Sequence, residues 1–169
     1  MTAVASSTAD APATFVNTYT VAPTQISFPV EKILEAAEGL VPADITGKFT
    51  FTLTAAEGVP MPETTVYTNP DANGGKVTFG TIQYTEPGIY EYTVTETGSV
   101  LGITNDAESA KKVTVTVVDN SNGTMTATAD STDDEPLTFV NTYTVQPTKT
   151  SFPVKKLLAV AEGLTAPDI

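Results

Sequence analysis

Apolar and polar residues alternate along this chain with a dominant period of two, not 3.6. Threonine and valine are abundant, and glycine and proline separate the alternating runs. Asn122-Gly123 is a hairpin-turn signal, and residues 34–40 have the composition of one helical turn. Many short strands between turns predict an all-β, antiparallel, immunoglobulin-like β-sandwich. The expected strands cover residues 14–20, 26–34, 47–54, 64–68, 76–79, 88–96, 111–119, 124–129 and 137–145.

One long string occurs twice at an offset of 124 positions. TFVNTYTV-x-PT-x-x-SFPV-x-K begins at Thr14 and again at Thr138. Self-similarity at a fixed spacing indicates a repeat array. We therefore expect one complete repeat with partial repeats on both sides. The expected units are residues 1–20 as the last hairpin or strand of a preceding repeat, 21–25 as a linker, 26–145 as the complete repeat, and 146–169 as a linker and the first strand of the next repeat.

The composition excludes several function classes. The net charge of −12 disfavours binding to nucleic acid or to an anionic membrane surface. The chain has no Cys and no His, so disulfides, thiolate metal sites and Ser-His-Asp catalysis are excluded. No apolar run approaches the length of a membrane helix, and no secretion signal follows Met1. We expect no cofactor, and a metabolic enzyme is disfavoured.

Two polar segments are weak calcium candidates. Residues 119–123 loosely resemble a calcium loop, but no bidentate Glu follows, so turn chemistry explains them better. A second group could bind Ca²⁺ before the last strand, although a solvated loop is the favoured interpretation. It consists of Asp130, Asp133, Asp134 and Glu135. We therefore expect no metal site.

Three expected strands each carry one polar residue on an otherwise apolar face. Side chains alternate between the two faces of a strand, so every second residue can be assigned to one side. This sorting places Lys32, Glu96 and Asn141 on the core side of their strands. The apolar residues that share these faces, and that we expect around the three, include Phe28, Val30, Tyr90, Tyr92, Phe139 and Tyr143.

Burying these groups without partners would cost several kcal/mol each, and three explanations remain open. The first is that each residue lies near a strand end where the core face opens to water. The second is a buried Lys32–Glu96 salt bridge with a hydrogen bond from Asn141. The third is chemistry: burial lowers the pKa of an amine and raises that of a carboxylic acid. A neutral lysine could then attack the Asn carboxamide, release ammonia and form an isopeptide bond.

Several motifs give the chain a family resemblance over about residues 26–145. They are V-x-K at 30–32, FTFTL at 49–53, VYTN at 66–69 with Gly74-Gly75, EPGIYEYTVTE at 86–96 and TFVNTY at 138–143. In these motifs the chain resembles the isopeptide linkage domains of Gram-positive pilins, the Cna B-type-like modules of streptococcal backbone pilins. The resemblance implies that Lys32 and Asn141 form the cross-link and that Glu96 promotes it. Asn17 and Lys156, the equivalents in the partial repeats, lack partners and are expected to stay unreacted.

The resemblance implies a structural repeat of a bacterial surface stalk, adhesin or pilus shaft. Such a repeat would be extracellular, anchored to the cell wall through other parts of its parent protein, and monomeric as a fragment. Its expected partners are neighbouring repeats, and isopeptide formation would be a single intramolecular event, not enzymatic turnover. A minor variant exchanges residues 14–20 between molecules and places the bond at Asn17. The alternative function is a ligand-binding adhesin module that recognises a host protein or glycan through its loops.

Overall fold

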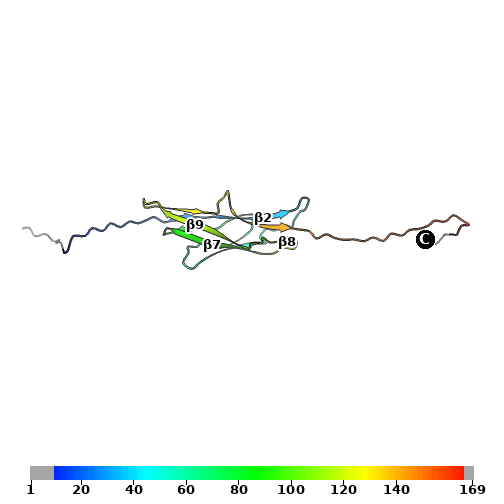
Figure 1. Cartoon of the computed structure of the whole chain (residues 1–169), viewed down its shortest axis with the longest axis horizontal. Helices are drawn as coiled ribbons and strands as arrows, with labels where there is room; N and C mark the ends of the chain where they lie inside the picture. The colour runs from blue at the N-terminus through cyan, green and yellow to red at the C-terminus, as the bar shows by residue number, and fades with distance from the viewer. Residues whose placement is uncertain (1–9, 166–169) are drawn as a thin grey trace, which may run out of the picture.

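The computed structural model describes residues 10–165, which form β-strands and no helix (Figure 1). None of these residues therefore belongs to a helix that could cross a membrane. The strands are β1 (Thr24–Ile26), β2 (Pro29–Ala36), β3 (Thr50–Ala55), β4 (Val66–Thr68), β5 (Gly74–Thr78), β6 (Ile82–Tyr84), β7 (Gly88–Thr97), β8 (Ile103–Thr104), β9 (Ala110–Asp119), β10 (Met125–Ala129) and β11 (Leu137–Tyr143).

The strands form two main sheets that face each other across an apolar core. One sheet has the order β10-β9-β7-β3-β4, the other has the order β5-β2-β11-β8, and β1 pairs with β6 at one end. Side chains from the two sheets meet directly, as where the Phe51 and Phe139 rings lie 5.5 Å apart. The predicted β-sandwich is confirmed. Alternation is also visible in the burial of β9, where Val113, Val115 and Val117 point into the core.

The strand pair β2–β11 departs from the antiparallel pattern because the two strands run parallel. Lys32 lies opposite Phe139 in this pair, and Asn141 lies opposite Leu34. Along the chain, β2 is the first strand of the two main sheets and β11 is the last. The first and last long strands are therefore hydrogen-bonded neighbours. The chain consequently enters at one end of the domain and leaves at the other (Figure 1).

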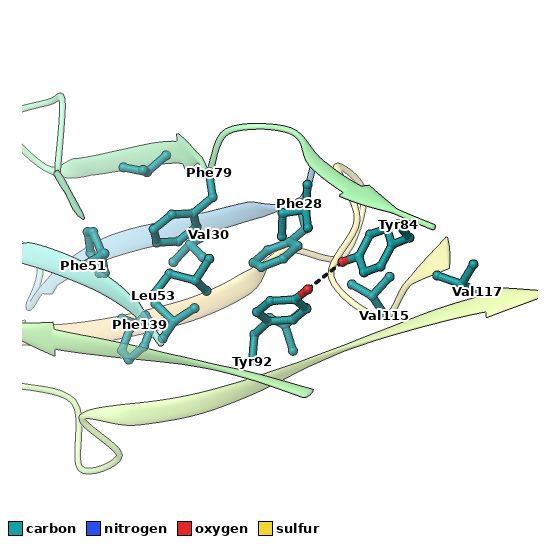
Figure 2. Packing of buried hydrophobic residues seen from close by; sticks show 14 of the residues in the cluster. Phe28, Val30, Phe51, Leu53, Phe79, Tyr84, Tyr92, Val115, Val117 and Phe139 are labelled. Carbon is teal, nitrogen blue, oxygen red and sulfur yellow. Dashed lines mark hydrogen bonds between the residues drawn. The ribbon is translucent and has the colours of Figure 1, made fainter. Parts of the chain in front are cut away.

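Aromatic rings fill the part of the core nearest the entering chain. The hydroxyl groups of Tyr84 and Tyr92 lie 2.8 Å apart, and the Tyr92 hydroxyl also donates to the carbonyl of Pro60 at 2.8 Å (Figure 2). Phe28 packs between Phe79 and Tyr92, with ring centroids 5.9 and 5.8 Å away. Each buried phenol thus has a polar partner, which removes the penalty of burying an unpaired hydroxyl.

Several expected element boundaries are corrected by the structure. The expected strand 26–34 divides into β1 and β2, which belong to different sheets, and Thr24 and Gln25 of the expected linker lie in β1. Residues 34–40 form no helix, because β2 continues to Ala36, where it still pairs with β11, and residues 37–40 form a tight turn in which the Leu40 N–H donates to the Ala37 carbonyl at 3.0 Å. The expected strands do not include β6 and β8, which have only three and two residues.

The two copies of the repeated string have different structures. Residues 138–143 lie in β11 between β2 and β8, whereas the expected strand at 14–20 is not formed. Phe15 is 90% exposed, and Phe152, in the expected first strand of the next repeat, is 79% exposed. A strand needs a neighbour for its backbone groups, and β11 already occupies the position between β2 and β8. The same residues therefore remain extended and exposed in the first copy.

A buried asparagine holds the loop that leads into β3. Asn69 is 1% exposed, and its Nδ2 donates to the carbonyls of Ile45 at 2.9 Å and Asp71 at 3.0 Å. Its Oδ1 accepts the backbone N–H of Phe49 at 3.0 Å. These three hydrogen bonds fix the buried side chains of Ile45 and Phe49 against the core.

Replacing Asn69 with Ala should lower the free energy of unfolding by about 2–3 kcal/mol, because three hydrogen bonds are lost and the buried N–H of Phe49 is left without a partner. Urea unfolding should show a lower midpoint with an unchanged slope. Asn73→Ala, an exposed position in the neighbouring turn, is the matched control and should leave the midpoint unchanged. Equal midpoints for Asn69→Ala and the wild type would contradict this role.

Candidate functional site

Lys32, Glu96 and Asn141 are all buried inside the sandwich. Their exposed fractions are 1%, 4% and 0%, so the explanation that they lie at open strand ends is wrong. Lys32 Nζ lies 2.7 Å from Glu96 Oε1 and forms an ion pair with it. Within residues 10–165, Oε1 has no other polar partner. The second explanation, a buried salt bridge, is therefore correct for the lysine and the glutamate.

The strand register explains how three residues far apart in sequence come together. Opposite residues in a parallel pair point to the same face, so Lys32 and Phe139 share the inner face of the β2–β11 pair. Asn141 lies two residues beyond Phe139, and the period of two returns it to that face. Glu96 comes from the opposing sheet, where it pairs with Phe51 of β3. The carboxylate thus faces the lysine across the core.

The surroundings of Lys32 favour loss of its proton. Burial lowers the pKa of the Lys32 amine, while the contact with Glu96 and the nearby charge of Asp106 act in the opposite direction. Nζ donates a 3.3 Å hydrogen bond to the carbonyl of Phe139, and it lies 5.0 Å from the centroid of the Phe49 ring. The amine is therefore enclosed between a carboxylate, a backbone carbonyl and an aromatic face.

The two ends of the Asn141 carboxamide have different environments. Its Oδ1 accepts a 2.7 Å hydrogen bond from the backbone N–H of Asp106. Its Nδ2 is buried and has no hydrogen-bond partner among the described residues. A donor on the oxygen polarises the carbonyl and makes the carbon more electrophilic. The carbonyl oxygen is therefore anchored, whereas no hydrogen bond within residues 10–165 holds the nitrogen.

Asp106 is itself fixed by its side chain. Its Oδ2 accepts from the backbone N–H of Val140 and from Lys111 Nζ, both at 2.8 Å, and its Oδ1 accepts from the N–H of Glu108 at 2.9 Å. Although burial raises the pKa of Asp106, these hydrogen bonds and the Lys111 charge lower it to about 2. Asp106 thereby attaches its loop to β11 beside Asn141.

Sequence reasoning did not identify Asp106, Lys111 or Phe49. Asp106 lies in the loop between β8 and β9, and Lys111, one of several lysines in the chain, is the second residue of β9. Alternation sorts residues only within strands, so it gives no information about a loop aspartate. Phe49 precedes β3 in the FTFTL motif, whose alternation marked it as apolar but not as a neighbour of Lys32.

The aromatic residues expected around the three polar groups are spread along the whole core. Val30 and Phe139 are fully buried near the site, whereas Phe28 and Tyr92 are each four residues away along their strands, about 13 Å. Figure 2 shows Phe28 and Tyr92 toward Tyr84, and Phe51 with Phe139 at the other side. The remaining residues are Tyr90, whose hydroxyl donates to the Glu86 carbonyl, and Tyr143, which is only partly buried.

The other candidate residues lie outside this cluster. Asn17 and Lys156 are exposed on the segments that flank the domain. In the acidic loop, Asp130 Oδ1 accepts from the backbone N–H of Thr114 at 2.9 Å, and the carbonyl of Asp133 accepts from Lys76 Nζ at 2.6 Å. Residues 10–165 contain no group of three or more acidic side chains arranged to hold a metal ion.

The lowered pKa of Asp106 predicts a stability contribution that is lost in acid. The group ionises at about pH 2 in the folded protein and at its ordinary value, near 4, when unfolded. Its contribution, about 2 kcal/mol, is therefore complete above pH 4 and disappears as the pH falls to 2. Urea unfolding of wild type and Asp106→Asn should differ at pH 5 and converge toward pH 2. A difference that stays constant over this range would contradict the prediction.

Comparison with known proteins agrees with this geometry. A family model described as FctA, Spy0128-like isopeptide containing domain, matches residues 28–144. This span is more than half of the chain and includes Lys32, Glu96 and Asn141. No curated protein matches the chain. The chain therefore belongs to the FctA family of Spy0128-like isopeptide-containing domains, a family of Gram-positive pilin modules.

Proposed function

We propose that this chain is a structural repeat of a bacterial surface stalk or pilus shaft, closed by an isopeptide bond between Lys32 Nζ and Asn141 Cγ. The observation that carries the proposal is the buried 2.7 Å contact between Lys32 and Glu96. Lys32 lies on the same inner face of the β2–β11 pair as Asn141. The family match supports a pilin-type module, whose members are surface components. The role of Glu96 is to move protons between the two reacting groups.

The reaction begins with a proton transfer within the ion pair. Glu96 Oε1 takes one proton from Lys32 Nζ, which leaves a neutral amine in a site where burial already disfavours the ammonium. The amine attacks Cγ of Asn141 and forms a tetrahedral intermediate. Negative charge develops on Oδ1, where the N–H of Asp106 already donates a hydrogen bond. A preorganised donor of this kind stabilises the intermediate without reorganisation.

The second half of the reaction expels the amide nitrogen. Glu96 donates its proton to Nδ2 and takes the second proton from Nζ, and the Cγ–Nδ2 bond breaks to release Nδ2 as ammonia. The Nζ–Cγ bond replaces the Cγ–Nδ2 bond, so a primary amine and a primary amide become a secondary amide and one ammonia. No oxidant and no cofactor takes part. Because both reactants belong to one chain, each molecule reacts once, and the protein is not an enzyme.

The bond would change how the domain carries tension. It would join the first and last long strands, which are already parallel neighbours. A pull on the two ends would pass from the start of β2 to Lys32, across the new bond, and from Asn141 to the end of β11. The intervening chain of about 110 residues would bear no load. By analogy with a disulfide of this loop length, the bond would also stabilise the fold by about 4–5 kcal/mol.

Intact mass under denaturing conditions tests the bond. The wild-type chain should be lighter than its sequence by about 17 Da, the mass of one ammonia. Proteolysis should then yield one branched peptide that contains Lys32 and Asn141. Glu96→Ala should have the full mass because its proton carrier is absent, and Asn141→Ala should have it because the acceptor is absent.

Glu91→Ala is the matched control, because it removes an exposed carboxylate from the same strand and should retain the deficit. Circular dichroism of each variant distinguishes a folded, unbonded domain from an unfolded one. A full mass in the folded wild-type protein would refute the proposal, as would a deficit in Glu96→Ala equal to that of the wild type.

Single-molecule pulling from the two ends tests the load path. The wild-type domain should show no unfolding step from the chain between Lys32 and Asn141. Folded Asn141→Ala should show a step of roughly 350–400 Å, the extended length of about 110 residues. A step of this size in wild-type molecules that carry the mass deficit would contradict the proposed path.

A further inference from the structure

The segment that enters the domain, at the end of the expected strand 14–20 and the start of the expected linker 21–25, is bound to the domain. The Tyr19 hydroxyl donates to Asp119 Oδ1 at 2.9 Å and accepts from the backbone N–H of Gly123 at 3.0 Å. The backbone N–H of Ala22 donates to the Gly123 carbonyl at 2.9 Å. We call this set of three hydrogen bonds the junction contact. It attaches residues 19–22 to the turn between β9 and β10.

The turn is held in shape by its own hydrogen bonds. Asp119 Oδ1 also accepts the N–H of Ser121 at 2.8 Å, and the N–H of Asn120 donates to the Thr124 carbonyl at 3.0 Å. Ser121 and Gly123 both have positive φ values, 59° and 84°, which turn the backbone tightly. The phenol of Tyr19 therefore meets a carboxylate oxygen and an N–H that the turn already holds in place.

Comparing the two copies of the repeated string shows what the junction contact adds. Val21 is partly buried and packs against the core of the domain that follows it. Its equivalent, Val145, is 51% exposed at the end where the chain leaves the domain. The string is the same up to this valine, so the burial of Val21 comes from the domain that follows it.

The equivalent of Tyr19 in the second copy is Tyr143, at the end of β11. Tyr143 is partly buried beside Gly102, and it lines an open cavity of about 600 Å³ with residues 101–104 and 144–146. In Figure 1 this end, near β8, is opposite the end where residues 10–22 approach the domain. A tyrosine that closes one repeat is thus placed where the following repeat would begin.

We propose that the 119–123 turn is the docking site for the strand end of the preceding copy of this repeat. The partner is the string TFVNTYTV, and the phenol of its tyrosine is recognised by Asp119 and Gly123. Tyr143 makes the equivalent contact with the turn of the copy that follows. Two hydrogen bonds from one phenol, a backbone hydrogen bond and the packing of Val21 restrict the angle between consecutive repeats. This proposal rests on the proposed array of repeats, but not on the isopeptide bond.

Amide hydrogen exchange of the full chain, followed by NMR, tests the junction contact. The amides of Gly123 and Ala22 should be protected in the wild type. Tyr19→Phe removes only the hydroxyl, so Gly123 should exchange about fivefold faster because it loses a hydrogen bond. The backbone of residues 19–22 should also become more mobile than in the wild type.

Tyr143→Phe is the matched control, since it removes the same atom from the equivalent residue of the second copy. It should leave the exchange of Gly123 unchanged. Exchange of Gly123 at the same rate in wild type and Tyr19→Phe would overturn the proposal. Order parameters below about 0.6 for residues 19–22 in the wild type would overturn it as well, because a bound segment is rigid.

Discussion

The parallel pairing of β2 with β11 is the constraint on which the rest of this structure depends. It makes the first and last long strands neighbours, and it places Lys32 and Asn141 on one inner face. An antiparallel pairing would bring the two ends of the chain out at the same end of the domain. The parallel pair sends them out at opposite ends, as an extended array requires. One register therefore serves both the candidate chemistry and the proposed mechanical role.

The buried ion pair makes sense as a reactive arrangement more than as a stabilising one. A lysine and a glutamate with exposed fractions of 1% and 4% lose their hydration, and their attraction often fails to offset that loss. Apolar residues of similar size would give a more stable core. Converting the amine to an amide would remove the positive charge from the interior, so the burial that lowers the pKa of Lys32 also favours the proposed product. Asp106, held by Lys111 and Val140, would contribute by orienting the acceptor carbonyl.

Two kinds of connection thus act at different places along the proposed array. The covalent one would lie inside each repeat and carry tension from β2 to β11. The other is the junction contact at the end of the domain, where hydrogen bonds restrain Tyr19 against the 119–123 turn. Load would pass along the chain between repeats. The junction contact would set the angle between consecutive repeats more than the force that the array withstands. Stiffness and tensile strength would then depend on different residues.

The sequence by itself determined the fold class, the repeat and the three polar core residues, because alternation with a period of two is a local property. It also contained the TFVNTY string twice, but not the reason why only one copy becomes a strand. Pairing decides that, since β2 and β8 accept β11 and leave no position for residues 14–20. The parallel register, Asp106 on the Asn141 carbonyl and Tyr19 on the turn likewise arise only in three dimensions. Each joins segments far apart in the sequence, and no local pattern records which distant backbone groups will meet.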